Sequence, residues 1–415
     1  MIKKPELLCP GGTLESIEEG LKYGADSVYI GLPSYSMRSR SKISIEEIYE
    51  GITIAHSNNK KVYIAFNIFA NDRDFINFDS VAKTIDSLNP DALIISDPGV
   101  FTFFRNKLPN IPLHVSTQAN ICSSHSVKFW QNLGASLCVL SRETSHKDFI
   151  QIRKNCPDIK LEIFVHGSMC MAYSGRCLIS NFISARSPNR GACSQPCRFN
   201  YLSSSITSDN GNQLILEQDN LGSYILNSKD LCLMPVLDQV LAANPDSLKI
   251  EGRNRSEYYV GSVVRAYRLA IDAYFSNPNS FNPEPFQQEL NVLESRGYTT
   301  AFFNGVLDHN AHNFDSSRSK SSHQVAGVIR NINSHSVIFE LRNEIKQGDT
   351  LFFILPNRLE KVQVKLDKII NAKNNQVVPK LSAGQANSIS IPLERFDKKV
   401  LPLLSNLILA YKKIS

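Results

Sequence analysis

Eight short apolar runs, separated by amphipathic helix-like stretches, are the feature that most constrains the fold of this 415-residue chain. Each is nearly continuous in apolar residues, as is typical of parallel strands buried on both faces. Eight β/α units in about 275 residues predict a (β/α)8 TIM-like barrel, with a doubly wound open sheet as the main alternative. The expected strands are Glu6–Cys9, Ser27–Ile30, Lys61–Asn67, Ala92–Asp97, Leu113–Gln118, Ser136–Ser141, Leu161–His166 and Ser247–Glu251.

Polar side chains stand at the ends of most of these runs. The carboxyl ends of the strands, and the loops after them, build the active site of such barrels. We therefore expect the polar side chains to converge on one face, which we call the barrel mouth, and to orient substrate or move protons there. The catalytic candidates are His166, Gln118, Arg142, Glu251 and Arg253, the substrate-binding candidates are His114 and Asn67, and Asp97 is a further polar strand end.

A long interval separates the seventh and eighth runs and carries five of the nine cysteines. It extends from Gly167 to Asp246, far longer than an ordinary loop, so the topology places it over the mouth. Thiolates gathered in this way predict a metal site, and the spacing leaves an iron–sulfur cluster and zinc both open. The candidate ligands are Cys170, Cys177, Cys193, Cys197 and Cys232, and the last two compete for one ligand position. Tyr173 and Arg176, which lie between Cys170 and Cys177, are further substrate-binding candidates.

The rest of the chain predicts a second domain. We expect the barrel domain over 1–305, with its cysteine-bearing insertion over 167–246, a linker over 306–322 and a small β-barrel over 323–415. From Ser322 onward there are 14 Lys and Arg against 7 Asp and Glu, whereas the other 321 residues hold 31 against 32. This excess suits a nucleic-acid-facing domain or an ordinary solvated surface.

The composition also bounds the compartment. Hydrophobic residues make up 42% of the chain, but no run of 18 apolar residues occurs and the N-terminus lacks the apolar region of a signal peptide. Nine cysteines without those features favour a reducing, cytoplasmic location over a disulfide framework, and no membrane partner is expected. Common hydrolase and nucleotide-binding motifs are missing, although a cysteine nucleophile with His166 as base is formally possible.

The stretch Glu162-Ile-Phe-Val-His-Gly-Ser-Met-Cys170, followed by Ser174-Gly-Arg-Cys177, resembles the signature of the collagenase-like peptidase family U-32. Further matching segments are Pro5-Glu-Leu-Leu-Cys-Pro-Gly-Gly12, His114-Val-Ser-Thr-Gln-Ala-Asn120, Pro188-Asn-Arg-Gly-Ala-Cys193 and Lys249-Ile-Glu-Gly-Arg253. The resemblance covers the whole expected barrel and, more loosely, the C-terminal domain.

The resemblance implies an enzyme of RNA modification that forms 5-hydroxyuridine at the tRNA wobble position, without molecular oxygen and with prephenate as a required metabolite. It also favours a four-iron (4Fe-4S) cluster over zinc, with Cys170, Cys177 and Cys193 as ligands and the fourth either Cys197 or Cys232. The expected partners are tRNA and this small metabolite, and the alternatives are a collagenase-like peptidase and a non-catalytic metalloprotein scaffold. The basic candidates for tRNA phosphates are Arg330, Arg342, Lys361, Lys365 and Lys368.

Overall fold

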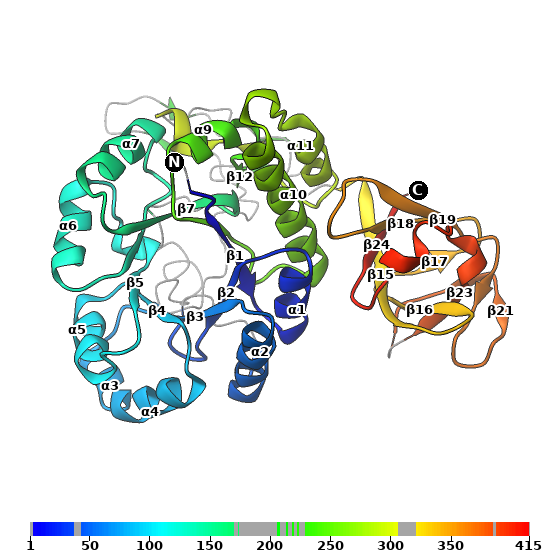
Figure 1. Ribbon diagram of the computed structural model, residues 1–415, viewed down its shortest axis with the longest axis horizontal. Coiled ribbons are helices and arrows are strands. Elements are labelled where there is room, and N and C mark those ends of the chain that lie inside the picture. The colour runs from blue at the N-terminus through cyan, green and yellow to red at the C-terminus, as the bar shows by residue number, and fades with distance from the viewer. Residues whose placement is uncertain are drawn as a thin grey trace.

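The structure is a computed structural model that describes residues 3–36, 43–169, 173, 229–305, 321–384 and 387–414, with short strand pairs between 206 and 223. Eight parallel strands close into a barrel, because the eighth, β13, pairs with both β1 and β7. Figure 1 shows them as a ring with the helices outside. The barrel strands are β1 (Glu6–Gly11), β2 (Ser27–Gly31), β3 (Lys61–Phe66), β4 (Ala92–Ile95), β5 (Leu113–Val115), β6 (Leu137–Val139), β7 (Lys160–Gly167) and β13 (Ser247–Ile250).

Helices follow the strands as expected and begin at recognisable caps. Thr13 accepts a hydrogen bond from the Ser16 backbone N–H at the start of α1, and Asp97 accepts from Gly99 and Val100 at the start of α5. Asp97 thus follows the carboxyl end of β4, as expected, and its carboxylate caps α5. The helices around the barrel are α1 (Leu14–Lys22), α2 (Ile45–Ser57), α3 (Asp72–Phe75), α4 (Phe78–Leu88), α5 (Pro98–Lys107), α6 (Ser124–Asn132), α7 (His146–Asn155), α9 (Leu237–Ala242), α10 (Glu257–Ser276) and α11 (Glu284–Asn291).

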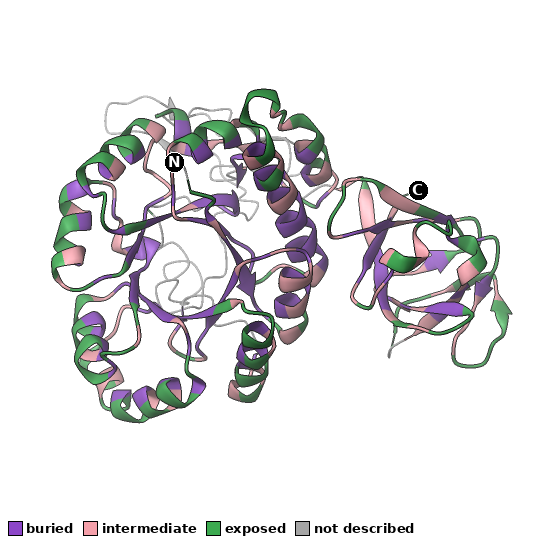
Figure 2. Cartoon of the chain, in the orientation of Figure 1, coloured by how far each residue is buried: buried purple, intermediate pink, exposed green. Residues whose placement is uncertain are grey.

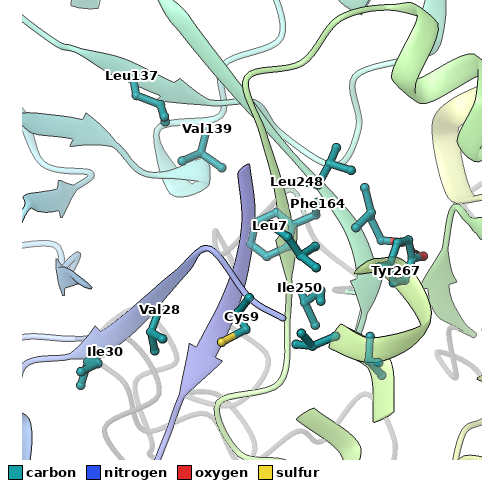
Figure 3. Packing of buried hydrophobic residues seen from close by; sticks show 14 of the residues in the cluster. Leu7, Cys9, Val28, Ile30, Leu137, Val139, Phe164, Leu248, Ile250 and Tyr267 are labelled. Atoms are coloured by element: carbon teal, nitrogen blue, oxygen red, sulfur yellow. Dashed lines mark hydrogen bonds between the residues drawn. The ribbon is translucent and has the colours of Figure 1, made fainter. Parts of the chain in front are cut away.

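Two apolar layers hold the barrel together. Alternate strand residues such as Leu7, Cys9, Val28 and Ile30 belong to the main core shared with the helices (Figure 3), and the barrel strands are buried along most of their length (Figure 2). A smaller cluster fills part of the barrel interior, which we call the lumen. Its members are Leu8, Tyr29, Tyr63, Ala65, Ala92 and Ile94.

The cysteine-bearing segment leaves the barrel at the end of β7 and returns beside it. The returning strand, β12 (Asp230–Cys232), runs antiparallel to β7, with Leu231 opposite Gly167 and Cys232 opposite His166. A further short strand, β14 (Tyr298–Thr299), then pairs with β12. Both ends of the segment are thus tied to the same strand end at the mouth.

The C-terminal part is antiparallel β structure, as the sequence predicts. Its main sheet is a half-barrel of six strands in the order β19-β18-β24-β15-β16-β23, and the expected linker falls mostly outside the described residues. A separate apolar core, which includes Phe339 and Phe353, supports it. The strands are β15 (His323–Ile332), β16 (Ser336–Leu341), β17 (Ile345–Lys346), β18 (Thr350–Ile354), β19 (Lys361–Lys365), β20 (Ile369–Ile370), β21 (Val377–Val378), β22 (Lys380–Leu381), β23 (Ser388–Pro392) and β24 (Leu409–Lys413).

The two domains meet along α1 and α10 in what we call the domain joint (Figure 1). The Tyr23 hydroxyl donates to the Ile354 carbonyl at 2.9 Å and accepts from the Leu409 N–H at 3.0 Å. The Arg265 side chain is 1% exposed, and its Nε donates to the Leu355 carbonyl at 2.7 Å. Within the described part of the chain, no helix is long and apolar enough to cross a membrane.

Candidate active site at the barrel mouth

Three neighbouring strand ends share one hydrogen-bonded group of side chains, which we call the mouth network. Asn67, after β3, donates to Gln118 Oε1 at 2.8 Å, and Ser116, after β5, donates to the same oxygen at 2.7 Å. Ser96, after β4, donates to the Asn67 carbonyl at 3.0 Å, and Ser36 lies 3.4 Å from Asn67 Oδ1. The structure therefore brings Asn67 and Gln118 together at the mouth, where the strand ends predict them.

Arg253 joins this network from the opposite side of the ring. It follows β13, is 8% exposed, and donates a hydrogen bond from Nη1 to Ser36 Oγ. It passes close to Gly31, where a Cβ would lie 2.5 Å from Arg253 Nη1 and 2.6 Å from Ser36 Oγ. The guanidinium is thus positioned by a hydrogen bond to a buried hydroxyl.

A buried ion pair lies deeper in the lumen, and our sequence reasoning missed it. Lys249 Nζ contacts Glu162 Oε1 at 2.8 Å, the two side chains are 5% and 1% exposed, and Ser247 donates to the other Glu162 oxygen at 2.7 Å. The Lys249 ammonium also lies 4.4 Å from the centre of the Tyr29 ring. The sequence feature that could have predicted this ion pair is a charged residue, Lys249, inside the otherwise apolar parallel strand Ser247-Leu-Lys-Ile250.

Cations other than Lys249 also border the lumen. The Arg142 guanidinium lies 3.8 Å from the centre of the Phe164 ring, and Arg253 lies 5.5 Å from that of Tyr29. Burial is the largest influence on Lys249 and lowers its pKa, Glu162 opposes this shift, and Arg253 and Arg142 add to it. This arrangement can hold an anionic small molecule between the mouth and the lumen.

His166 does not face the mouth, contrary to our expectation for a catalytic base. The β7–β13 pairing shifts register between Lys249 and Ile250, so that His166 pairs with Ile250 and its ring lies against Tyr259 and Tyr267 of α10. This bulge changes the side to which the following residue points. Burial, followed by the Arg255 cation, lowers the pKa of His166 to about 3, and neither ring nitrogen has a hydrogen-bond partner among the residues that the structure describes.

Gly167 fixes the root of the cysteine segment against the end of β13. Its φ is +116°, and a Cβ there would lie 2.5 Å from the Glu251 carbonyl oxygen. The Glu251 N–H in turn donates to the His166 carbonyl at 2.9 Å, and Glu251 is 5% exposed. Glu251 therefore lies beside the point where the segment leaves the barrel, as predicted for a mouth residue.

Cys232 is the only candidate ligand among the described residues. Its thiol donates to Gln287 Oε1 at 3.3 Å and lies 3.8 Å from the Tyr267 hydroxyl, and burial raises its pKa to about 11. A thiol in this buried position next to aromatic rings could bind an iron–sulfur cluster. Burial disfavours the thiolate form of Cys232, but the positive charge of bound iron would favour it. No three His, Cys, Asp or Glu side chains converge as metal ligands among the described residues.

The other predicted residues of the segment are not brought into this site. Tyr173 is described only as exposed. The residues outside the described ranges are Cys170, Cys177, Cys193, Cys197 and Arg176.

His114 lies nearer the opposite end of the barrel than we expected. Strand β5 ends at Val115 and the chain turns at Thr117–Ala119, so His114 lies in the lumen below Gln118. Its ring packs edge-on against Tyr63 with 4.8 Å between ring centres. Burial, followed by the nearby Lys249 cation, lowers its pKa to about 3. This position corrects our placement of His114 at the mouth.

Comparison with known proteins agrees with the sequence signature. Residues 12–313 match the profile of "Peptidase family U32". The chain is 34% identical over 404 residues to "tRNA hydroxylation protein P1" of Bacillus subtilis (strain 168), covering 96% of this chain and 94% of the relative. It is also 33% identical to "tRNA hydroxylation protein P" of Escherichia coli (strain K12), covering 94% of each chain. It is 29% identical to a "Collagenase" of Porphyromonas gingivalis (strain ATCC BAA-308 / W83), covering 95% and 98%. The chain therefore belongs to peptidase family U32.

Proposed function

We propose that this chain is an enzyme that hydroxylates uridine in tRNA, forming 5-hydroxyuridine at the wobble position without molecular oxygen. The observation that carries the proposal is the attachment of the cysteine segment, whose two ends meet at Gly167 and Leu231 beside the mouth. The names of the full-length relatives support tRNA as the substrate class. The mouth network offers amide and hydroxyl groups that could bind a base edge.

An iron–sulfur cluster would suit this chemistry. When bound, a cluster could bind the oxygen-donating species or transfer electrons. Cys170, Cys177 and Cys193 would hold it, with Cys197 or Cys232 as the fourth ligand. Burial of Cys232 beneath α10 and α11 would shield that side from water. Zinc bound by the same thiols is the alternative.

Prephenate is the co-substrate that we propose, because its two carboxylates need cationic partners. Arg142 and Arg253 both border the lumen, and each guanidinium lies over an aromatic ring. Arginine binds carboxylates through paired hydrogen bonds. The bound metabolite would then lie between the mouth network and the Lys249–Glu162 pair.

The C-terminal domain is our candidate for contacts to tRNA phosphates, although the structure narrows the basic residues available. Arg342 contacts Glu257 at 3.2 Å, Lys361 contacts Glu289 at 2.8 Å, and Arg330 forms an ion pair with Glu340. Lys365 and Lys368 remain exposed. We therefore favour these two lysines as phosphate contacts.

A collagenase-like activity receives less support from the geometry. His166 and Cys232 are cross-strand neighbours, but they are only 0% and 1% exposed. A peptide substrate could not reach that sulfur without local opening of the wall. The pair therefore does not form an accessible nucleophile and base.

The test is nucleoside mass spectrometry of tRNA from a deletion strain that carries either the native gene or a variant. We expect 5-hydroxyuridine derivatives to return with the native gene and to be absent with Cys177→Ser. Cys156→Ser is the matched control, since Cys156 is a buried cysteine at the end of α7, and it should restore the nucleoside. Full modification with Cys177→Ser, or in the deletion strain itself, would contradict the proposal.

Iron content separates the cofactor from the activity. Protein purified without oxygen should carry about four irons per chain if the cluster is present. One zinc per chain in place of iron would refute the cluster while leaving the modification test unaffected. Comparing the iron content of Cys197→Ser with that of Cys232→Ser identifies the fourth ligand.

A further inference from the structure

A cavity opens at the end of the barrel opposite the mouth. It has a volume of about 370 Å³ and is bordered by the first residues of five barrel strands, which shows that it lies at their amino ends. Those residues are Glu6, Lys61, Leu137, Lys160 and Ser247. This volume is within the range of sites for small molecules.

Cations outnumber carboxylates around this cavity. Lys3, Lys4, Lys61, Lys160 and Arg268 line it together with Glu6, Asp26 and Asp246. Each carboxylate is already engaged. Glu6 accepts from Ser27, Lys61 and Tyr63, Asp26 from Leu7, Lys60 and Arg268, and Asp246 from Leu161 and Arg153.

Two of these ammonium groups belong to exposed side chains and have no ion-pair partner within the described part of the chain. Among the described residues, neither the Lys3 nor the Lys160 side chain has an ion-pair or hydrogen-bond partner. Saturated carboxylates leave little capacity to bind a cation, whereas uncompensated ammonium groups attract an anion. The charge of the cavity therefore selects for negative ligands.

The floor of the cavity carries an imidazole that is also without a hydrogen-bond partner. His114 is 7% exposed, lines the cavity and packs against Tyr63, but its ring makes no hydrogen bond to a described residue. Because its pKa is lowered to about 3, the ring is neutral near neutral pH and offers one N–H donor. Because His114 lines the open cavity, a ligand or water can accept this hydrogen bond.

We propose that this cavity is a binding site for a small anion with a carboxylate or phosphate group, held by Lys3 and Lys160 and by the His114 N–H. The site is distinct from the mouth. First residues of the barrel strands border it, and no residue of the mouth network is among its lining residues. A bound anion would therefore lie beneath the Lys249–Glu162 pair rather than among the mouth network.

Isothermal titration of the full chain tests this proposal, with inorganic phosphate and citrate as separate probes. We expect saturable binding of at least one probe, which also distinguishes the phosphate from the carboxylate source. Binding should weaken about tenfold in Lys160→Ala and further in the Lys3→Ala/Lys160→Ala variant, because each removes an uncompensated charge. Lys83→Ala, which changes an exposed lysine of α4, is the matched control and should bind as the native chain does.

The outcomes separate clearly. Absence of saturable binding of both probes at millimolar concentration would overturn the proposal. So would equal weakening by Lys83→Ala and Lys160→Ala, since that would indicate general charge attraction. The proposal would also be refuted if substitution of Arg253 abolished phosphate or citrate binding while Lys160→Ala bound as tightly as the native chain. The anion would then bind at the mouth.

Discussion

Removing one partner of the buried Lys249–Glu162 pair should destabilise the barrel strongly. In Glu162→Gln, the Lys249 ammonium would stay 5% exposed, beside the Tyr29 ring and within the influence of Arg253 and Arg142, without its carboxylate. A buried charge left in this way costs about 3–5 kcal/mol of unfolding free energy. The double variant Glu162→Gln/Lys249→Met removes both charges and should recover most of that loss.

Urea unfolding followed by circular dichroism provides the measurement. Lys107→Met is the matched control, because Lys107 and Asp79 form an ion pair whose side chains are 47% and 71% exposed. Its loss should cost no more than about 1 kcal/mol. If Glu162→Gln costs as little as Lys107→Met, or if the double variant is no better than Glu162→Gln, the reasoning about an uncompensated buried charge is refuted.

Three other expectations can be checked with the same unfolding assay. Gly167→Ala should lower the free energy of unfolding more than Gly348→Ala does, because both glycines have positive φ but only a Cβ at position 167 would meet backbone atoms. Equal decreases for the two variants would contradict a clash with Glu251. The free energy of unfolding should fall as the pH decreases from about 6.5 toward 3, because the unfolded chain then binds a proton at His114 that the buried ring does not. His114 should contribute up to about 1.4 kcal/mol per pH unit to this fall. His114→Phe should therefore show a shallower pH slope, and an unchanged slope would refute this. Arg265→Lys should lower the unfolding midpoint by losing hydrogen bonds to the Leu355 and Arg358 carbonyls, and an unchanged midpoint would show that the joint does not depend on them.

The barrel and part of its mouth were predictable from sequence, because both follow from the order of strands. Asn67 and Gln118 converge since neighbouring parallel strands end at the same edge. The position of His166 was not predictable, because a bulge in the β7–β13 pairing changes the facing of one residue, and that pairing joins strands far apart in the sequence. His114 was misplaced because we grouped it with the strand-end residues, whereas it is the second residue of β5 and its side chain lies inside the barrel.

The Lys249–Glu162 pair shows a different limit. Each residue stands in a recognisable motif, but their contact depends on the register between β7 and β13, which are separated by the whole cysteine segment. Sequence spacing cannot give that register. The burial of Cys232 against Tyr267 and Gln287 likewise depends on helices that follow it in the chain.

The domain joint has a consequence for any RNA that engages both domains. Tyr23 and Arg265 bind backbone groups of β18, β24 and the segment after β18, so the attachment does not rely on the covalent connection through residues 306–320. A chain cut within that connection should still migrate as one particle. The C-terminal domain would then hold a fixed position relative to the barrel. That position sets the distance between the mouth and the point at which the domain can bind an RNA phosphate backbone.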